Sequence, residues 1–146
     1  MQRIGQKIED RIFIDASAFV SLNVPFDSDH KRAIDLSSLI KNVGITLFTS
    51  NIVIYETASI LSQKIGILYA NEFLNDMENS TLVIILVDEE VEILAFEIFR
   101  ERTSKNVSMF DCLHFAVMRM NGITTVFGFD KHFKKAGFKL LSDQVV

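Results

Sequence analysis

The sequence predicts an α/β fold with three layers, in which a mostly parallel central sheet is flanked by helices on both faces. Short apolar runs of strand length alternate with longer amphipathic segments along the chain, and this alternation is typical of βαβ units joined by right-handed crossovers. The 146 residues, 49% of them hydrophobic, suffice for one domain with a substantial core and are too few for two ordinary domains. We therefore expect a flexible N-terminal arm over residues 1–10 and a single domain over residues 11–146.

The predicted strands are apolar runs bounded by turn or capping residues. The first, at 11–14, is uninterrupted, which indicates a strand buried on both faces. Further strands are expected at 45–48, 82–87 and 123–127, with a candidate edge strand at 140–141. The run at 82–87 is the most hydrophobic of them, so we place it near the centre of the sheet or in a firmly paired position.

The predicted helices lie between these strands and begin at residues with capping side chains. Ser17 is expected to cap a helix at 18–23, and Thr49-Ser50 is expected to cap one at 51–65. The other helices that precede residue 106 are predicted at 28–43, 67–79 and 88–105. Acids open the last of these and basic residues close it, which is the charge order that the helix dipole favours.

The stretch from 106 to 133 holds the strongest functional signal. Ser108 and Asp111 have the spacing of a capping box, in which the acid returns to the amide of the capping residue. An apolar helix follows and leads into the strand at 123–127, and Asp130 comes shortly after that strand. Ligands bind at the carboxyl ends of the strands in a parallel α/β sheet, so we expect Asp130 to lie at a functional edge.

Two further acids have comparable positions. Asp15 follows the first strand, and Glu56 lies inside the helix at 51–65 on the same face as two isoleucines. An acid on an apolar stripe is either paired or holds a cation, because a lone carboxylate is costly to bury. Asp15, Glu56, Asp111 and Asp130 are therefore expected to converge at one edge of the sheet.

Several carboxylates in one cleft repel one another and raise one another's pKa unless a cation neutralises them. Hard oxygen ligands without an accompanying cluster of His or Cys favour Mg²⁺ or Mn²⁺ over Zn²⁺. Such ions polarise a phosphodiester, lower the pKa of a bound water and stabilise the leaving oxygen. The predicted site therefore suits phosphoryl chemistry.

Each acid taken singly also has an ordinary explanation. The capping box accounts for Asp111, a semi-buried ion pair accounts for Glu56, and turn or cap positions account for Asp15 and Asp130. It is the convergence of the four that favours a metal site.

Other polar and aromatic residues near the acids leave alternatives open. His114 lies one turn after Asp111 and either reaches the cleft or is a satisfied structural histidine. Cys112 has no acid–base partner in evidence and is expected in the core. Phe129 and Phe133 either join the core or supply a ring on which a base stacks.

The sequence also predicts a compartment. Cys112 is the single cysteine, so the chain cannot form an internal disulfide, and Met1–Arg11 lacks the apolar centre of a signal peptide. The longest apolar runs are of strand length, which is too short to span a membrane. We therefore expect a cytoplasmic protein with no membrane association.

Together, these motifs resemble the PIN domain, in particular the VapC-like toxin ribonucleases. The resemblance rests on Asp15-x-Ser17 after a strand, Thr49-Ser50 before a helix bearing Glu56, Ser108-x-x-Asp111-Cys112 opening a helix, and Asp130 with Phe133 after a strand. It covers nearly the whole chain from Arg11 onward, in the order and spacing of the family. It implies a PIN-like three-layer sandwich.

The resemblance also implies a metal-dependent ribonuclease. Asp15, Glu56, Asp111 and Asp130 would be ligands of Mg²⁺ or Mn²⁺, and Ser17 would order the first acid or a metal-bound water. Similar proteins usually form homodimers, and many are inhibited by a small antitoxin that inserts a segment over the acidic cleft. The chain departs from the family at Gly128, where members typically carry Thr or Ser, and this departure bears on the role of Asp130.

An RNA substrate requires positive charge near the acids. The formal net charge of −4 does not favour unspecific binding to a polyanion, but a local basic patch can overrule the mean. The segment from 131 to 139 contains four lysines and no acid, and it is either such a patch or a solvated surface helix. The candidate RNA contacts are Lys131, His132, Lys134 and Lys135.

Two alternatives to a VapC-like toxin remain. The chain could be a stand-alone PIN nuclease of RNA maturation or decay, without an antitoxin. It could also be a catalytically silent PIN-like binding module, an alternative that Gly128 keeps open.

Overall fold

The computed structural model describes residues 9–41 and 43–145. Its strands and helices follow the predicted alternation. In chain order they are β1 (Arg11–Ile14), α1 (Ala16–Asn23), α2 (His30–Ile40), β2 (Thr46–Ser50), α3 (Asn51–Lys64), α4 (Ile67–Glu78), β3 (Val83–Ile85), α5 (Glu89–Glu101), α6 (Met109–Met120), β4 (Thr125–Phe127), α7 (Lys131–Lys135) and β5 (Lys139–Leu140). A 3₁₀ helix at Leu141–Gln144 follows β5.

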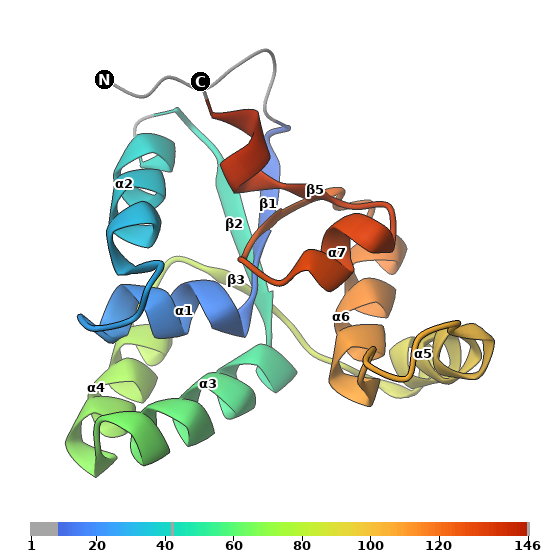
Figure 1. The fold of residues 1–146 in the computed structure, drawn as a ribbon, viewed down its shortest axis with the longest axis horizontal. Helices are drawn as coiled ribbons and strands as arrows, with labels where there is room; N and C mark the ends of the chain where they lie inside the picture. Colours follow the sequence, from blue (N-terminus) through green and yellow to red (C-terminus); the bar gives the residue numbers. More distant parts are fainter. Residues whose placement is uncertain (1–8, 42, 146) are drawn as a thin grey trace.

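The strands form one sheet in the order β3-β2-β1-β4-β5, and every pairing in it is parallel. The chain moves outward from β1 to β3 and then returns to β4 and β5 on the other side of β1. Right-handed crossovers therefore place α1 to α4 on one face of the sheet and α5 to α7 on the other (Figure 1). The predicted three-layer α/β fold with a mostly parallel sheet is confirmed.

The reversal of direction creates a crevice between β1 and β4. Phe13 of β1 pairs with Phe48 on one side and Val126 on the other, so β1 lies at the centre of the sheet. The helices that follow these two central strands cover opposite faces, which leaves space at the strands' carboxyl ends. This crevice is the position at which doubly wound sheets bind their ligands.

The core forms around the two central strands. Ile12, Phe13 and Ile14 are buried, as are all three residues of β4. The uninterrupted apolar run at 11–14 correctly predicted a strand covered on both faces.

The prediction for the run at 82–87 was wrong. Its central part forms β3, which lies at an edge of the sheet and pairs only with β2. Val83 and Ile84 of β3 are exposed, and Leu86 just after it is 69% exposed. The hydrophobicity of a strand indicates that its side chains need to be shielded from water. It does not show whether helices of the same chain or a partner protein shield them. The candidate edge strand at 140–141 is confirmed one residue earlier, as β5 at the opposite edge.

Side-chain caps are present at three of the predicted helix starts, whereas Asp29 before α2 makes no side-chain cap hydrogen bond. Ser50 caps α3 and Asp88 caps α5, and Ser108 with Asp111 forms the complete capping box of α6. Helix α1, however, is capped by Asp15 and not by Ser17, and it begins two residues earlier than predicted. The carboxylate lies one residue before the helix and so reaches its first free amides, whereas Ser17 is already inside the first turn.

Most of the predicted N-terminal arm, residues 1–8, lies outside the described residues. Asp10, at the end of that prediction, already joins the sheet, because its carbonyl accepts a hydrogen bond of 2.8 Å from the amide of Thr46. Within the described part of the chain, no helix combines the length and the apolar character needed to cross a membrane.

Candidate active site

The four predicted acids line one cavity of about 480 Å³, which we call the acid cavity, together with Asp27 and Asp29. Asp15 directly follows β1 and Asp130 follows β4, so both lie at the crevice between the central strands. Glu56 projects from α3, and Asp111 projects from the first turn of α6. The structure thus brings together all four residues that the sequence singled out.

Asp15 is the most deeply buried of these acids. Its Oδ2 atom accepts hydrogen bonds from the hydroxyl of Ser17 at 2.8 Å and from the amide of Ser17 at 3.3 Å. Burial raises the pKa of the Asp15 carboxyl above its ordinary value, although the nearby His114 and the Ser17 hydrogen bonds act in the opposite direction. The ionised form is therefore destabilised, and a cation in the cavity would relieve this.

The hydroxyl of Ser17 lies directly beside Gly128. Its Oγ atom donates to Asp15 and accepts a hydrogen bond of 3.0 Å from the amide of Phe129. A Cβ atom on residue 128 would lie 3.0 Å from Cβ of Asp15 and 3.1 Å from Oγ of Ser17. Glycine at 128 therefore leaves the room that the Ser17 hydroxyl occupies.

His114 lies between two of the acids. Its Nε2 atom is 2.6 Å from Oε1 of Glu56 and 3.8 Å from Oδ1 of Asp15. Burial by itself lowers the pKa of His114, but the hydrogen bond with Glu56 and the neighbouring carboxylate charges outweigh burial and raise the pKa above 6.5. Glu56 is thus a paired acid, which was one of the two explanations open for an acid on an apolar stripe.

The sequence analysis did not choose between the two roles of His114, and the structure combines them. The ring is buried and stacks at 6.4 Å on Phe133, as a structural histidine would, yet its Nε2 atom lies on the wall of the acid cavity. The available signal was its spacing of one helical turn from Asp111.

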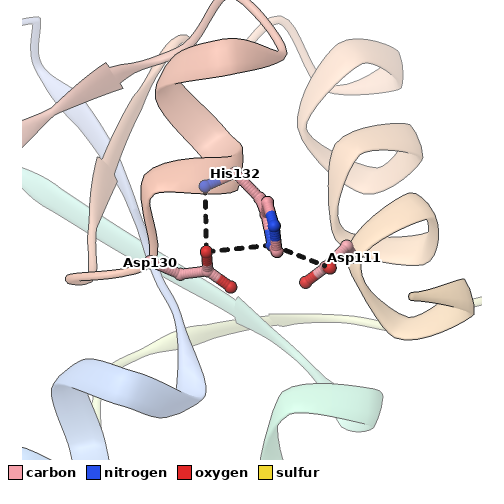
Figure 2. Close-up of side chains that lie close together, drawn as sticks. All are labelled: Asp111, Asp130 and His132. Atoms are coloured by element: carbon pink, nitrogen blue, oxygen red, sulfur yellow. Dashed lines mark hydrogen bonds and ion pairs between the residues drawn. The ribbon is translucent and has the colours of Figure 1, made fainter. Parts of the chain in front are cut away.

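Asp111, Asp130 and His132 form a second group in the same crevice, shown in Figure 2. The Nδ1 atom of His132 lies 3.1 Å from Oδ1 of Asp130 and 3.3 Å from Oδ2 of Asp111. One potential ligand atom from each residue lies within 4.8 Å of the others. The Nδ1 atom is buried and has no hydrogen bond of good geometry to any described residue. The sequence analysis considered His132 only as an RNA contact and missed this position.

Both carboxylates of this group also stabilise helix starts. Oδ2 of Asp111 accepts from the amide of Ser108 at 2.9 Å, and Oδ1 of Asp130 accepts from the amide of His132 at 2.9 Å. These bonds fix the orientation of each carboxylate and leave one oxygen of each without a backbone partner. The capping explanation and a ligand role are therefore compatible for both acids.

The donor set of the cavity fits a divalent cation. Four carboxylates supply hard oxygen atoms of the kind that Mg²⁺ and Mn²⁺ prefer. The buried Nδ1 atom of His132 adds a nitrogen donor that lacks a hydrogen bond among the described residues. A nitrogen donor increases affinity for Mn²⁺ more than for Mg²⁺, because Mn²⁺ is the softer ion.

The remaining candidates divide between core and surface. Cys112 is buried, and burial followed by the charge of Asp111 raises the pKa of its thiol, which opposes a nucleophilic role. Phe133 is fully buried, so it cannot stack on a base. Phe129 is partly exposed, and the guanidinium of Arg32 lies 4.9 Å from the centre of its ring.

Three of the predicted basic residues lie close to the acids. Lys131, Lys134 and Lys135 line a second cavity of about 600 Å³, which shares Asp29 and Phe129 with the acid cavity. This second cavity, which we call the lysine cavity, therefore lies beside the acids. Lys134 also forms an ion pair of 3.0 Å with Asp143, in the 3₁₀ helix after β5.

Comparison with known proteins agrees with this geometry. The PIN domain family model matches residues 12–139. The 23S rRNA-specific endonuclease VapC20 of Mycobacterium tuberculosis (strain CDC 1551 / Oshkosh) is 30% identical over 127 residues, which are 87% of this chain and 95% of that protein. VapC20 of strain ATCC 25618 / H37Rv gives the same values.

Solved structures show the same fold. The crystal structure of M. tuberculosis VapC20, described as a sarcin-ricin loop cleaving toxin, superposes with a TM-score of 0.80 at 28% identity and covers 87% of this chain and 95% of its own. FitAcB from Neisseria gonorrhoeae has a TM-score of 0.65 at 20% identity and covers 88% and 95%, a likeness that concerns the fold alone. By its sequence match and its relatives, the chain belongs to the PIN domain family.

Proposed function

We propose that the chain is a divalent-metal-dependent endoribonuclease of the PIN/VapC type, which hydrolyses RNA phosphodiesters as the toxin of a toxin–antitoxin pair. The observation that carries this proposal is the convergence of Asp15, Glu56, Asp111 and Asp130 in one cavity. The relative that is 30% identical over 127 residues is a 23S rRNA-specific endonuclease, which supports RNA as the substrate.

The four acids are the proposed catalytic and metal-binding residues. They would hold Mg²⁺ or Mn²⁺, which when bound polarises the phosphodiester and lowers the pKa of the attacking water. Ser17 orients Asp15 through its hydroxyl, and His114 holds the carboxylate of Glu56 at the cavity wall. Both residues thus act by positioning a ligand.

His132 is proposed as an additional ligand beside Asp111 and Asp130. Neighbouring corners of an octahedron with metal–ligand bonds of about 2.1 Å are about 3.0 Å apart. The Nδ1 atom of His132 lies 3.1 and 3.3 Å from the two carboxylates, close to that spacing. An imidazole nitrogen here would make the site favour Mn²⁺ over Mg²⁺.

Lys131, Lys134 and Lys135 are the proposed RNA contacts, because the lysine cavity that they line adjoins the acid cavity. Phe129 lies at the border of the two cavities with Arg32 over its ring, and a base could stack there. Lys131 and Lys135 form no ion pair with any described residue, which leaves their charges available to phosphates.

The proposed protein partners are a cognate antitoxin and a second copy of the chain. VapC20 is described as a toxin in its crystal structure, which supports an antitoxin here. Exposed apolar side chains on and around β3 support a homodimer. Val83 and Ile84 of the edge strand β3 and Leu86 just after it are 42%, 38% and 69% exposed, and an apolar sheet edge of this kind is normally covered by a partner. The cytoplasm, where RNA and reduced cysteine coexist, is the proposed location.

The test is cleavage of a labelled RNA pool, and of RNA containing the sarcin-ricin loop, by the purified full chain. Each RNA is incubated with Mn²⁺, with EDTA, and with the variants Asp111→Asn and Asp35→Asn. Asp35 is an exposed acid of α2 that does not line the acid cavity. Asp35→Asn therefore removes one negative charge, as Asp111→Asn does, without changing the site. We expect metal-dependent cleavage that Asp111→Asn abolishes and Asp35→Asn preserves.

The other functions predict different results. A stand-alone nuclease would cleave RNA but would not inhibit growth when expressed. A silent binding module would bind no Mn²⁺ and cleave no RNA under any condition. Absence of cleavage by inhibitor-free protein would refute the catalytic proposal.

A further inference from the structure

A cavity of about 310 Å³ between the end of α5, α6 and α7 contains an unusual concentration of positive charge. Arg102, Arg119 and Lys135 line it together with one acid, Glu101. The three cations form no ion pair within 4.0 Å with any described residue, Glu101 included. The chain as a whole has a formal charge of −4, but the side chains that line this cavity have a net positive charge. Such a local positive charge is what an anionic ligand requires.

The guanidinium of Arg102 is held in place at the rim of this cavity, which we call the Arg102 cavity. Its Nη1 atom donates a hydrogen bond of 2.6 Å to the carbonyl of Phe99, and its Cζ atom lies 3.4 Å from the centre of the Phe99 ring. Its Nε atom is buried and has no hydrogen-bond partner among the described residues. The contacts with Phe99 fix the guanidinium in one orientation, and its Nη2 group forms no hydrogen bond with any described residue, so this group is the donor available to an acceptor such as a phosphate oxygen.

Arg119 reaches the same region from the last turn of α6. Arg102, directly after α5, and Arg119, on α6, therefore line one cavity although they come from different helices. Thr103 and Ser104 also line the cavity. These groups are all hydrogen-bond donors of the kind that surround phosphate.

His132 separates the Arg102 cavity from the acids. Its ring lines the Arg102 cavity, while its Nδ1 atom contacts Asp130 at 3.1 Å and Asp111 at 3.3 Å. Only the imidazole ring of His132 would therefore separate an anion in this cavity from the acids beside which the scissile phosphate is proposed to bind. Consecutive phosphates of one RNA strand have to occupy neighbouring positions of this kind.

We propose that the Arg102 cavity binds a backbone phosphate of the RNA next to the phosphate that is cleaved. Arg102 and Arg119 are its principal contacts, and Lys135 lies where this cavity meets the lysine cavity. The inference rests on the proposed ribonuclease function and adds to it a phosphate subsite on the α5–α6 side of the acids. Because these contacts are made to the phosphate backbone of the RNA, they contribute affinity that does not depend on the RNA sequence.

The experiment measures the binding of a short labelled single-stranded RNA of randomised sequence to the full chain in EDTA, where metal-dependent cleavage does not occur. The variants are Arg102→Gln, Arg119→Gln and Arg100→Gln, each over a series of salt concentrations. Arg100 is an exposed residue of α5 outside the cavity, so it reports the effect of one lost charge alone. Inorganic phosphate serves as a competitor.

We expect Arg102→Gln and Arg119→Gln each to weaken RNA binding about tenfold, which corresponds to one charge-assisted contact. The slope of log affinity against log salt should fall by about 0.7 for each, as for one phosphate contact on a single strand. Arg100→Gln should change neither quantity beyond the general charge effect. Arg102→Lys should recover part of the affinity, which separates charge from loss of packing on Phe99.

Steady-state cleavage with Mn²⁺ separates this inference from the proposed function. If wild-type protein cleaves RNA, the two cavity variants should raise KM and leave kcat nearly unchanged, because the contact is to a phosphate that does not react and is equal in ground and transition states. Wild-type affinity and KM in both variants would overturn the inference while the ribonuclease stands. Competition by inorganic phosphate with unchanged RNA binding in the variants would identify an anion site that RNA does not use, and would also overturn it.

Discussion

The Nε2 atom of His114 and the Oε1 atom of Glu56 lie 2.6 Å apart, although 58 residues separate them in the chain. The same nitrogen is 3.8 Å from Asp15. A second imidazole, that of His132, lies between Asp111 and Asp130. Each of these two pairs of carboxylates thus has one histidine beside it. In the absence of metal, the imidazole of His114, whose pKa is raised by Glu56 and Asp15, offsets the repulsion between these two acids.

Replacement of His114 by Leu should destabilise the metal-free protein, because it leaves Asp15 and Glu56 facing each other. We expect a loss of about 2 kcal/mol, less than the roughly 3–5 kcal/mol for a fully buried pair, because the Glu56 side chain is 24% exposed. Urea unfolding with EDTA measures the loss. Added Mn²⁺ should restore much of the stability, and equal destabilisation with and without Mn²⁺ would contradict the charge explanation.

The stability of the metal-free protein should decrease as the pH rises above 6.5. The folded-state pKa of His114 is raised above 6.5, so its stabilising contribution is complete below that value and is lost as the pH rises through the folded pKa. The pKa of Asp15 is raised by burial, and its contribution changes in the same direction above 3.8. Melting temperatures in EDTA across this range provide the measurement. His114→Gln should flatten the profile above pH 6.5, and an unchanged profile would exclude His114 as its source.

Replacement of His132 by Ala should weaken Mn²⁺ binding about 10- to 100-fold if its nitrogen supports the ion as proposed. Mg²⁺ binding should weaken less, since Mg²⁺ gains less from a nitrogen donor. Calorimetric titration of both ions measures this difference. His30→Ala is a matched control, because His30 contacts the carbonyl of Ser21 and does not line the acid cavity. Unchanged Mn²⁺ affinity would leave only the RNA-contact role for His132.

Substitution of Gly128 by Ser should cost about 1–3 kcal/mol, the usual range for overpacking. The new Cβ would meet Cβ of Asp15 at 3.0 Å and Oγ of Ser17 at 3.1 Å. Combining Gly128→Ser with Ser17→Ala should recover part of the lost stability. Ser17→Ala removes the Oγ atom that the new Cβ would meet, and Gly128→Ser returns a hydroxyl to the same region. Gly128→Ala serves as the control that adds the Cβ without the hydroxyl. A fully stable single variant, measured by thermal melting, would show that the backbone moves aside.

The proposed homodimer predicts that Leu86→Lys yields a monomer, because it introduces a charge into the exposed apolar surface beside β3. Light scattering coupled to gel filtration measures the mass of each species. Phe26→Lys is the control, since Phe26 is 73% exposed and belongs to the segment between α1 and α2, not to β3 or its flanks. A wild-type monomer, or a Leu86→Lys dimer, would rule out this surface as the interface.

The sequence by itself determined the class of the fold, most of its helix starts and the identity of the four acids. These features are local: apolar runs predict strands, and the box of Ser108 and Asp111 depends on residues three apart. The acids follow strands whose carboxyl ends share one edge, so their convergence also follows from the fold class.

Only the tertiary structure decided which elements are neighbours. The hydrophobic run at 82–87 became an edge strand, because sheet order depends on the direction of each crossover and not on the composition of a strand. Ser17 and Phe129 are 112 residues apart and yet share the hydrogen bond that explains Gly128. The positions of His114 and His132 between the acids, and the grouping of Arg102 with Arg119, likewise depend on packing between distant segments, which no local pattern encodes.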